Sequence, residues 1–355
     1  MGHTIKREAY TVHITSPVLH VDNESRKRSG HMSHAMAEFA PGKVIAFNGN
    51  CSAAIYDGHG TFGWTEYRIS EDGGETFSEP HDFPLSKKML YDGIHTVSVE
   101  KIVATENGRI VAFCLLNDAH ALCEPWFDPP LVCISEDGGK TWSDGKALFP
   151  ECGRIYDAVY HKGEIYVIQF CNDATINFLG NKPEHVYRLY KSADQGESFN
   201  EIAVIPTDSM GRSYASIIFD KNENLHLYTY NVNEEHDPDH LVSADYGRTW
   251  ENKGTCHLAK GSRNIQTALI DDVFILHCRG EEINRNKLAL YTSLDGYTWD
   301  EGTFIDHTDF GTCFYSNNLL LKDKDGNERL LLQYSHSYIT KCTNVRHAWL
   351  TVEKK

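Results

Sequence analysis

The chain has 355 residues, with 50 acidic and 34 basic side chains and a formal net charge of −16 when the histidines are neutral. This surplus of negative charge argues against nucleic acid or an anionic membrane as a partner, and no apolar run reaches the roughly 18 residues of a membrane span. Hydrophobic residues make up 41% of the chain, which is enough for a large globular core. Residues 1–8 contain no apolar run of signal-peptide type, so we expect a cytoplasmic protein, or a secreted one whose leader has been removed.

Short apolar strands and turns alternate along the whole chain. The first predicted strand lies at about residues 8–15. In the unit that follows, a Pro41-Gly42 turn joins strands at 34–39 and 44–47, and a third strand at 66–69 leads into another turn. The second unit repeats this order with strands at 96–99 and 110–113, and further units start near Tyr156, Tyr214, Asn264 and Tyr315.

A repeated turn follows the third strand in five of these units. The pattern Ser-x-Asp-x-Gly-x-Thr-Trp, with Ser for Thr or Phe for Trp in some copies, begins at Ser70, Ser135, Ser192 and Ser243, and a shorter copy begins at Ser293. Its Asp can accept hydrogen bonds from the backbone of its own turn, and its Gly supplies a positive φ. The repeats predict an all-β fold over residues 1–355, a six-bladed β-propeller of four-stranded antiparallel blades. We expect the N-terminal strand to close the last blade.

The repeated turns resemble the Asp boxes of the sialidase superfamily, and the resemblance covers about residues 30–350. It implies a six-bladed propeller with the active site on the axis. Asp boxes lie at the outer edge of the blades and also occur in propellers that only bind, so the function must be read from the axial residues.

Polar and aromatic residues stand where the two inner strands of each blade should meet the mouth of the central channel. Such a set favours a polar ligand, and a carbohydrate is the expected partner. The predicted substrate-binding residues are His34, Asn48, Tyr156, Asn172, Tyr214, Arg263, Arg279, Arg285 and Tyr334.

The sialidase resemblance carries over in part. The family's nucleophile is a Tyr opening the last blade in a Tyr-Ser context, which Tyr315 matches, and one of its three carboxylate-binding arginines matches Arg285. Ser33 or His34 stands where another of these arginines is expected, and the family's glutamate partner of the tyrosine falls near Tyr214. We therefore expect a divergent member that acts on a sugar other than a standard sialoside.

The predicted function is an exo-acting glycoside hydrolase for a glycan or acidic sugar, with Tyr315 as its nucleophile. Further catalytic candidates are Asp57, His95 and Asp118, and Asp92 and Asp157 are other carboxylates of the same region. Two alternatives stay open: a polysaccharide lyase that uses His and Tyr, and a non-catalytic sugar-binding propeller. His31, His34, His95 and His120 are a candidate metal set, but no ligand spacing supports it, so we expect neither metal nor cofactor. The sequence does not indicate an oligomeric state.

Overall fold

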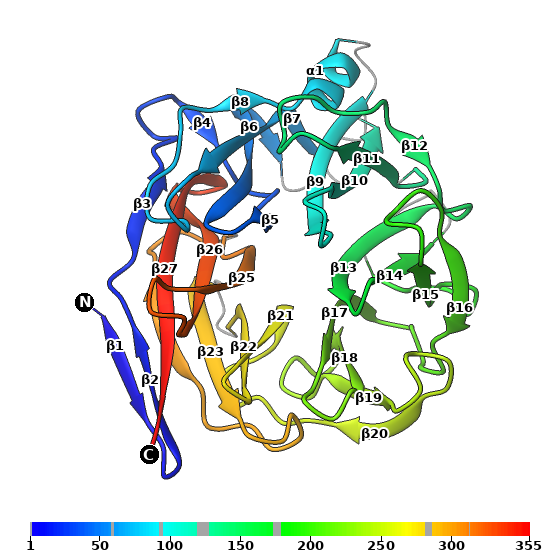
Figure 1. Cartoon of the computed structure of the whole chain (residues 1–355), viewed down its shortest axis with the longest axis vertical. Helices are drawn as coiled ribbons and strands as arrows, with labels where there is room; N and C mark the ends of the chain where they lie inside the picture. Colours follow the sequence, from blue (N-terminus) through cyan, green and yellow to red (C-terminus); the bar gives the residue numbers. More distant parts are fainter. Residues whose placement is uncertain are drawn as a thin grey trace.

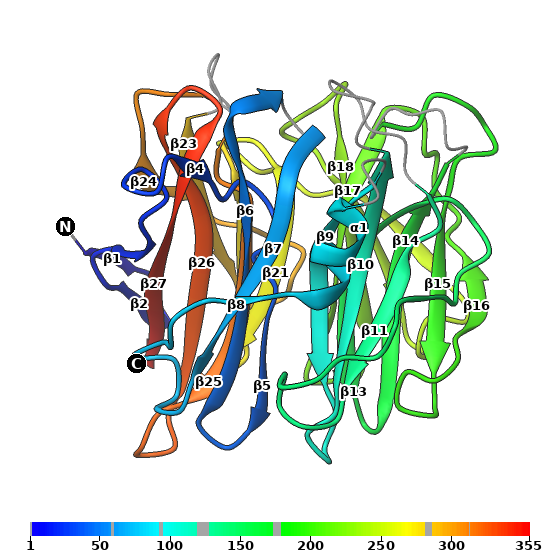
Figure 2. The ribbon, with the colours of Figure 1, turned by 90° about the horizontal axis from the view of Figure 1, so that it is seen from above.

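Six antiparallel sheets stand around a central axis like the blades of a propeller (Figure 1), and their strands run along that axis when the ring is seen from its edge (Figure 2). The computed structural model describes residues 2–57, 60–91, 95–118, 128–172, 179–280, 286–311 and 313–355, without the side chains of 53–57, 60, 61 and 118. The arrangement confirms the predicted all-β, six-bladed β-propeller. None of the described helices has the length and apolar character needed to cross a membrane.

Blades two to five each contain four strands in sequence order from the axis outward. Blade two consists of β9 (His95–Ala104), β10 (Ile110–Asp118), β11 (Leu131–Ser135) and β12 (Lys146–Ala147). Blade three consists of β13 (Gly153–His161), β14 (Glu164–Cys171), β15 (Val186–Ser192) and β16 (Asn200–Val204). Blade four consists of β17 (Arg212–Phe219), β18 (Leu225–Asn231), β19 (Asp239–Ser243) and β20 (Glu251–Thr255). Blade five consists of β21 (Arg263–Ile270), β22 (Val273–Arg279), β23 (Lys287–Ser293) and β24 (Thr303–His307).

Blades one and six are larger than the four strands predicted for them. Blade one has five strands, β4 (Arg28–Ser29), β5 (Met36–Ala40), β6 (Lys43–Asp57), β7 (Gly60–Ser70) and β8 (His81–Asp82), and α1 (Pro84–Leu90) follows. Blade six has β25 (Ser316–Lys322), β26 (Glu328–Ile339) and β27 (Cys342–Lys354), together with β1 (His3–Lys6), β2 (Tyr10–Ile14) and β3 (Val18–Val21). The long strands β6 and β27 extend beyond their neighbours, so β4 and β3 pair with the edges that would otherwise be exposed.

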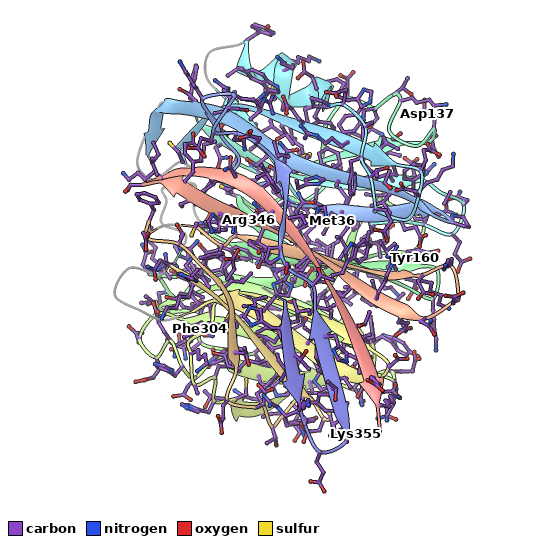
Figure 3. The ribbon with its side chains drawn as sticks, turned by 90° about the vertical axis from the view of Figure 1, so that its left-hand side faces the viewer. Met36, Asp137, Tyr160, Phe304, Arg346 and Lys355 are labelled. Carbon is purple, nitrogen blue, oxygen red and sulfur yellow. The ribbon has the colours of Figure 1, made fainter. Side chains whose placement is uncertain are left out.

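The two ends of the chain meet in blade six. β2 pairs antiparallel with β27, from Tyr10 opposite Lys354 to Ile14 opposite Leu350. Figure 3 shows these N-terminal strands beside β27, which ends next to the labelled Lys355. This pairing joins the first and last segments of the chain, and β1 adds one more strand outside β2.

The hydrophobic core lies between neighbouring blades. The second strands β14, β18 and β22 are buried along almost their whole length, because each blade packs on both faces against the next. β14 and β22 are accordingly mostly apolar, whereas β18 also contains the buried polar residues His226 and Thr229. Because the blades pack against one another in this way, the polar side chains of the inner strands point toward the axis.

The repeated turns fold on their own hydrogen bonds. In the second copy, Ser135 Oγ accepts the Gly139 N–H at 2.8 Å, and the Asp137 carboxylate accepts the Thr141 N–H at 2.8 Å and the Thr141 hydroxyl at 2.7 Å. Gly139 has a φ of 88°, which a residue with a side chain adopts only with strain. Asp137 lies at the margin of the molecule, away from Met36 on the inner strand of blade one (Figure 3).

One lysine joins the inner strands across the axis. Lys101 Nζ on β9 lies 2.9 Å from Asp157 Oδ1 in blade three, 2.7 Å from Asn317 Oδ1 in blade six and 2.5 Å from Gln266 Oε1 in blade five. Asp157 Oδ2 also accepts hydrogen bonds from blade four, from the Ser216 hydroxyl at 2.7 Å and from the Ile217 backbone N–H at 2.9 Å. We call these residues the Lys101 knot. It links five of the six blades and closes the channel at that level.

We expect Lys101→Met to destabilise the protein by about 3–5 kcal/mol, because it leaves the buried Asp157 carboxylate without its cation. The matched control is Lys191→Met, since the ion pair of Lys191 with Glu164 lies in the outer part of blade three and is partly exposed. That control should change the free energy of unfolding by less than about 1 kcal/mol. Urea denaturation measures both; equal losses in the two variants would contradict a special role for the knot.

Asp137→Ala should lower the melting temperature and leave ligand binding on the axis unchanged. Backbone and side-chain hydrogen bonds from Thr141 hold the pKa of Asp137 below its usual range, so the stabilising carboxylate is lost as the pH falls. The difference in melting temperature between variant and wild type should therefore shrink in acid. Asp144→Ala, which removes an exposed partner of Lys88, is the control and should have little effect at any pH.

Candidate functional site

A cavity of about 40 Å³ lies on the axis, next to the Lys101 knot and where the inner strands begin. It has room for a water molecule or a single small polar group of a ligand. Side chains and backbone from five blades form its wall. The lining residues are Met32, Ser33, His34, Glu100, Lys101, Arg154, Tyr156, Asn264, Gln266, Tyr315, Ser316 and Asn317.

The backbone is irregular at this level in every blade. The pairing register of the inner strand shifts opposite Phe113 and Cys114 in blade two, and at residues 155–157, 212–215 and 263–266 in blades three, four and five. In blades one and six the chain enters the inner strand through Ser33 and Phe314, both with positive φ. β-Bulges of this kind turn side chains toward a site. In blade two the shift lets the consecutive residues Glu100 and Lys101 both line the cavity.

Tyr315 is the centre of the site. Its phenol is buried, and its hydroxyl lies 3.1 Å from the Tyr214 hydroxyl. The guanidinium carbon of Arg279 lies 4.5 Å from the centre of the Tyr315 ring, and the His31 ring packs edge-on at 4.5 Å. Burial raises the pKa of Tyr214, and either hydroxyl of the pair can donate the hydrogen bond between them.

Three buried arginines surround this phenol. Arg154, Arg263 and Arg279 are 3%, 8% and 3% exposed, and Arg263 and Arg279 stand directly opposite each other on β21 and β22. Burial raises the pKa of Tyr315, but the three arginine charges and the hydrogen bond with Tyr214 outweigh it and bring the pKa below its usual range. Arg279 Nε and Nη2 make no hydrogen bond with any residue that the structure describes. Cations buried side by side are stabilised by an anion, so the site suits an anionic ligand.

Six of the residues predicted from the sequence come together here. His34, Tyr156 and Tyr315 line the cavity, and Tyr214, Arg263 and Arg279 surround the phenol of Tyr315. Tyr156 donates or accepts a hydrogen bond with Ser213 at 2.9 Å. Burial lowers the pKa of His34 to about 4, so its imidazole is neutral at pH 7.

Other predicted residues lie away from the cavity. Asn48 is buried with its Oδ1 accepting a hydrogen bond from Arg68 at 2.5 Å, and the Tyr334 hydroxyl donates to Asp306 at 2.7 Å. His95 lies 3.7 Å from the Asp128 carboxylate, and Asn172 does not line the cavity either. The polar groups of Asn48 and Tyr334 therefore bond to side chains of other strands rather than facing the cavity.

Several predictions fall on parts of the chain that the structure leaves undescribed. Arg285, Asp92 and His120 lie outside the described residues, as do the side chains of Asp57 and Asp118. Among the residues that are described, no three His, Cys, Asp or Glu side chains are grouped to hold a metal ion.

The sequence analysis missed Glu100, Lys101 and Arg154 as site residues. Arg154 precedes Tyr156 by two positions on β13, and strand alternation places both on one face. Glu100 and Lys101 interrupt an otherwise apolar strand, and a charged pair in a buried strand needs partners nearby. Both signals were present in the sequence.

Comparison with known proteins places the fold. No protein-family model and no curated protein matches the chain. A solved protein of unknown function from Dyadobacter fermentans is 15% identical with a TM-score of 0.70, covering 96% of this chain and 99% of its own. The Hadza microbial sialidase Hz136 is 13% identical with a TM-score of 0.67, covering 95% of this chain and 68% of its own.

A mutant of the NanB sialidase from Streptococcus pneumoniae is similar to the same extent. It is 11% identical with a TM-score of 0.66, covering 95% of this chain and 70% of its own. Likenesses at such low identity show the fold alone. The chain thus has a divergent sialidase-like propeller fold, and the resemblance seen in the sequence is confirmed at that level.

Arg279→Met should raise the pKa of Tyr315, because it removes the charge that opposes burial most strongly. The ionised phenol would then appear only at higher pH. A titration by ultraviolet absorbance, with Tyr315→Phe subtracted to remove the other tyrosines, measures the shift. Arg188→Met is the control, since Arg188 pairs with Glu201 on outer strands. An unchanged Tyr315 titration in the Arg279 variant would contradict the described electrostatics.

Proposed function

We propose that the protein is an exo-acting glycoside hydrolase for an acidic sugar, with Tyr315 as the nucleophile. The observation that carries the proposal is the phenol of Tyr315, buried among Arg154, Arg263 and Arg279 with its pKa below the usual range. A phenol is a poor nucleophile at neutral pH unless neighbouring charge favours the phenolate. The sialidase-like fold supports this proposal at the level of fold only.

The proposed reaction has two steps. The Tyr315 phenolate attacks the anomeric carbon, the bond to the leaving oxygen breaks, and a carboxylic acid protonates that oxygen. Water then cleaves the tyrosyl–sugar bond, and the phenolate is restored as the acid residue takes up a proton. The sequence candidates for the acid are Asp57, Asp92, Asp118 and Asp157. The guanidinium groups of Arg279 and Arg263 are suited to hold the carboxylate of the sugar.

The closed channel favours attack at a chain end. The Lys101 knot fills the axis beside the cavity, so a polysaccharide cannot thread through the ring. A terminal sugar that enters from the mouth can still reach Tyr315. Because the matches to the family's arginine positions are incomplete, the proposed substrate is an acidic sugar other than a standard sialoside.

The same charges also suit a polysaccharide lyase, which is the second candidate. In that reaction a base removes the proton next to a carboxylate, and cations stabilise the enolate. His34 lines the cavity and is neutral at pH 7, but burial lowers its pKa to about 4, which makes it a weak base for this step. A lyase product contains a new carbon–carbon double bond, whose ultraviolet absorbance separates the two reactions. A propeller that only binds sugar would release no product at all.

Tyr315→Phe should keep the fold and ligand binding but lower kcat by on the order of 100-fold or more, because it deletes only the reacting hydroxyl. The assay uses umbelliferyl glycosides of uronic acids and sialic acid, and the sialoside should turn over at less than about 1 s⁻¹. The control is Tyr228→Phe, whose hydroxyl donates to Gly296 between blades four and five. Near wild-type turnover by the Tyr315 variant would contradict the proposal, and so would efficient hydrolysis of the sialoside with Tyr315 removed.

A further inference from the structure

A buried ion pair joins blades two and three at the wall of the axial cavity. Arg154 Nε and Nη2 lie 3.0 Å and 2.5 Å from Glu100 Oε2. The other carboxylate oxygen, Glu100 Oε1, and the remaining guanidinium nitrogen, Arg154 Nη1, are buried and make no hydrogen bond with any described residue. A buried polar atom without a hydrogen bond lowers the stability of the fold. These two atoms therefore favour the binding of a further polar group.

A second ion pair, in which the carboxylate of Glu66 is buried and Arg26 is partly exposed, shows the contrast. Glu66 accepts hydrogen bonds from Arg26 on both oxygens, at 3.0 Å and 2.7 Å, and Asn50 contacts one of them as well. Glu66 lies in blade one and does not line the axial cavity. Both carboxylate oxygens of Glu66 are thus bonded, whereas Glu100 Oε1 at the cavity is the one buried carboxylate oxygen without a hydrogen bond among the described residues.

The unused atoms are one acceptor and one donor. A hydroxyl group suits either atom, because it can donate to a carboxylate oxygen and accept from a guanidinium nitrogen. A second carboxylate could not donate to Glu100, and an ammonium group could not accept from Arg154. The cavity that both residues line, about 40 Å³, has room for one such group.

We propose that Glu100 and Arg154 form a hydroxyl-recognition subsite beside Tyr315. The ligand is then a hydroxylated sugar acid, with its anionic group at Arg279 and a free ring hydroxyl between Glu100 and Arg154. Arg279 lies over the ring of Tyr315, and Arg154 lies over the ring of Tyr214, whose hydroxyl is 3.1 Å from that of Tyr315, so we place the two groups on one sugar ring. The inference rests on the proposed function for the anion at Arg279, and it adds which sugar acids the site selects.

The test compares two probes that share a six-membered ring and a carboxylate. Methyl glucuronide carries ring hydroxyls, and the corresponding tetrahydropyran carboxylate carries none. Calorimetric titration of the wild-type protein should give a Kd for the glucuronide that is about tenfold or more tighter, because a hydrogen bond to a charged group is at stake. Equal affinity for the two probes would overturn the subsite and leave the anion site standing, whereas binding of neither would overturn both proposals.

Two further variants test whether the preference for the hydroxylated probe comes from the Glu100–Arg154 ion pair. The double variant Glu100→Met with Arg154→Met replaces the buried pair by apolar side chains of similar volume, a change that often preserves stability. In it the ratio of the two Kd values should fall to about one, and Glu100→Gln should lower the ratio in part. Glu66→Gln is the control and should keep the wild-type ratio of the two Kd values. The melting temperature of each variant is measured in parallel to confirm that it is folded.

Two results separate this inference from the proposed reaction. A ratio that survives in the double variant would show that the hydroxyl preference comes from elsewhere and would overturn the subsite. A ratio that is lost as expected, in a protein that turns over no acidic glycoside, would support the subsite and contradict the hydrolase.

Discussion

The cation of Lys101 at the centre of the ring is the interaction on which the rest of the site depends. Its ammonium group takes oxygen partners from blades three, five and six, and Asp157 extends the contact to blade four. These contacts set the inner strands at one height around the axis and block the channel. The site beside the knot is therefore a pocket with a floor rather than a pore, and water exclusion there strengthens every nearby charge interaction.

The position of the polar residues follows from how a propeller buries its strands. Each second strand is covered on both faces, so a charge buried there needs a partner, and charged side chains gather where the strands reach the axis. Register shifts in blades two to five turn extra side chains inward at a single level. The resulting cluster places Arg263 opposite Arg279 on neighbouring strands. The register shifts and the cluster of charged side chains thus lie at the same height along the axis of the ring.

The fold could be predicted almost entirely from the sequence, because its signals are local. Each repeated turn carries its own hydrogen-bond acceptors, as in Asp137, and the strands between the turns are short apolar runs. The site could be predicted only in part. Tyr315 and Arg279 were found because they begin or end a strand, but Glu100 reaches the cavity through a bulge that no periodicity reveals. Asn48 and Tyr334 have the same local context as site residues, and only the neighbouring strands show that Arg68 and Asp306 occupy their polar groups.

The arginines also explain why functional residues of a propeller cannot all be assigned by matching sequence positions with a family that it resembles. In a ring of similar blades, residues at the same height on different blades lie around the same axis. A cation can therefore be supplied from blade three, as Arg154 is, or from blade five, as Arg263 and Arg279 are, and still act on the same phenol. Sequence position ties a residue to its blade, whereas the chemistry depends on height and distance from the axis. The charge around Tyr315 is consequently a better guide to the ligand than the blade from which each charge comes.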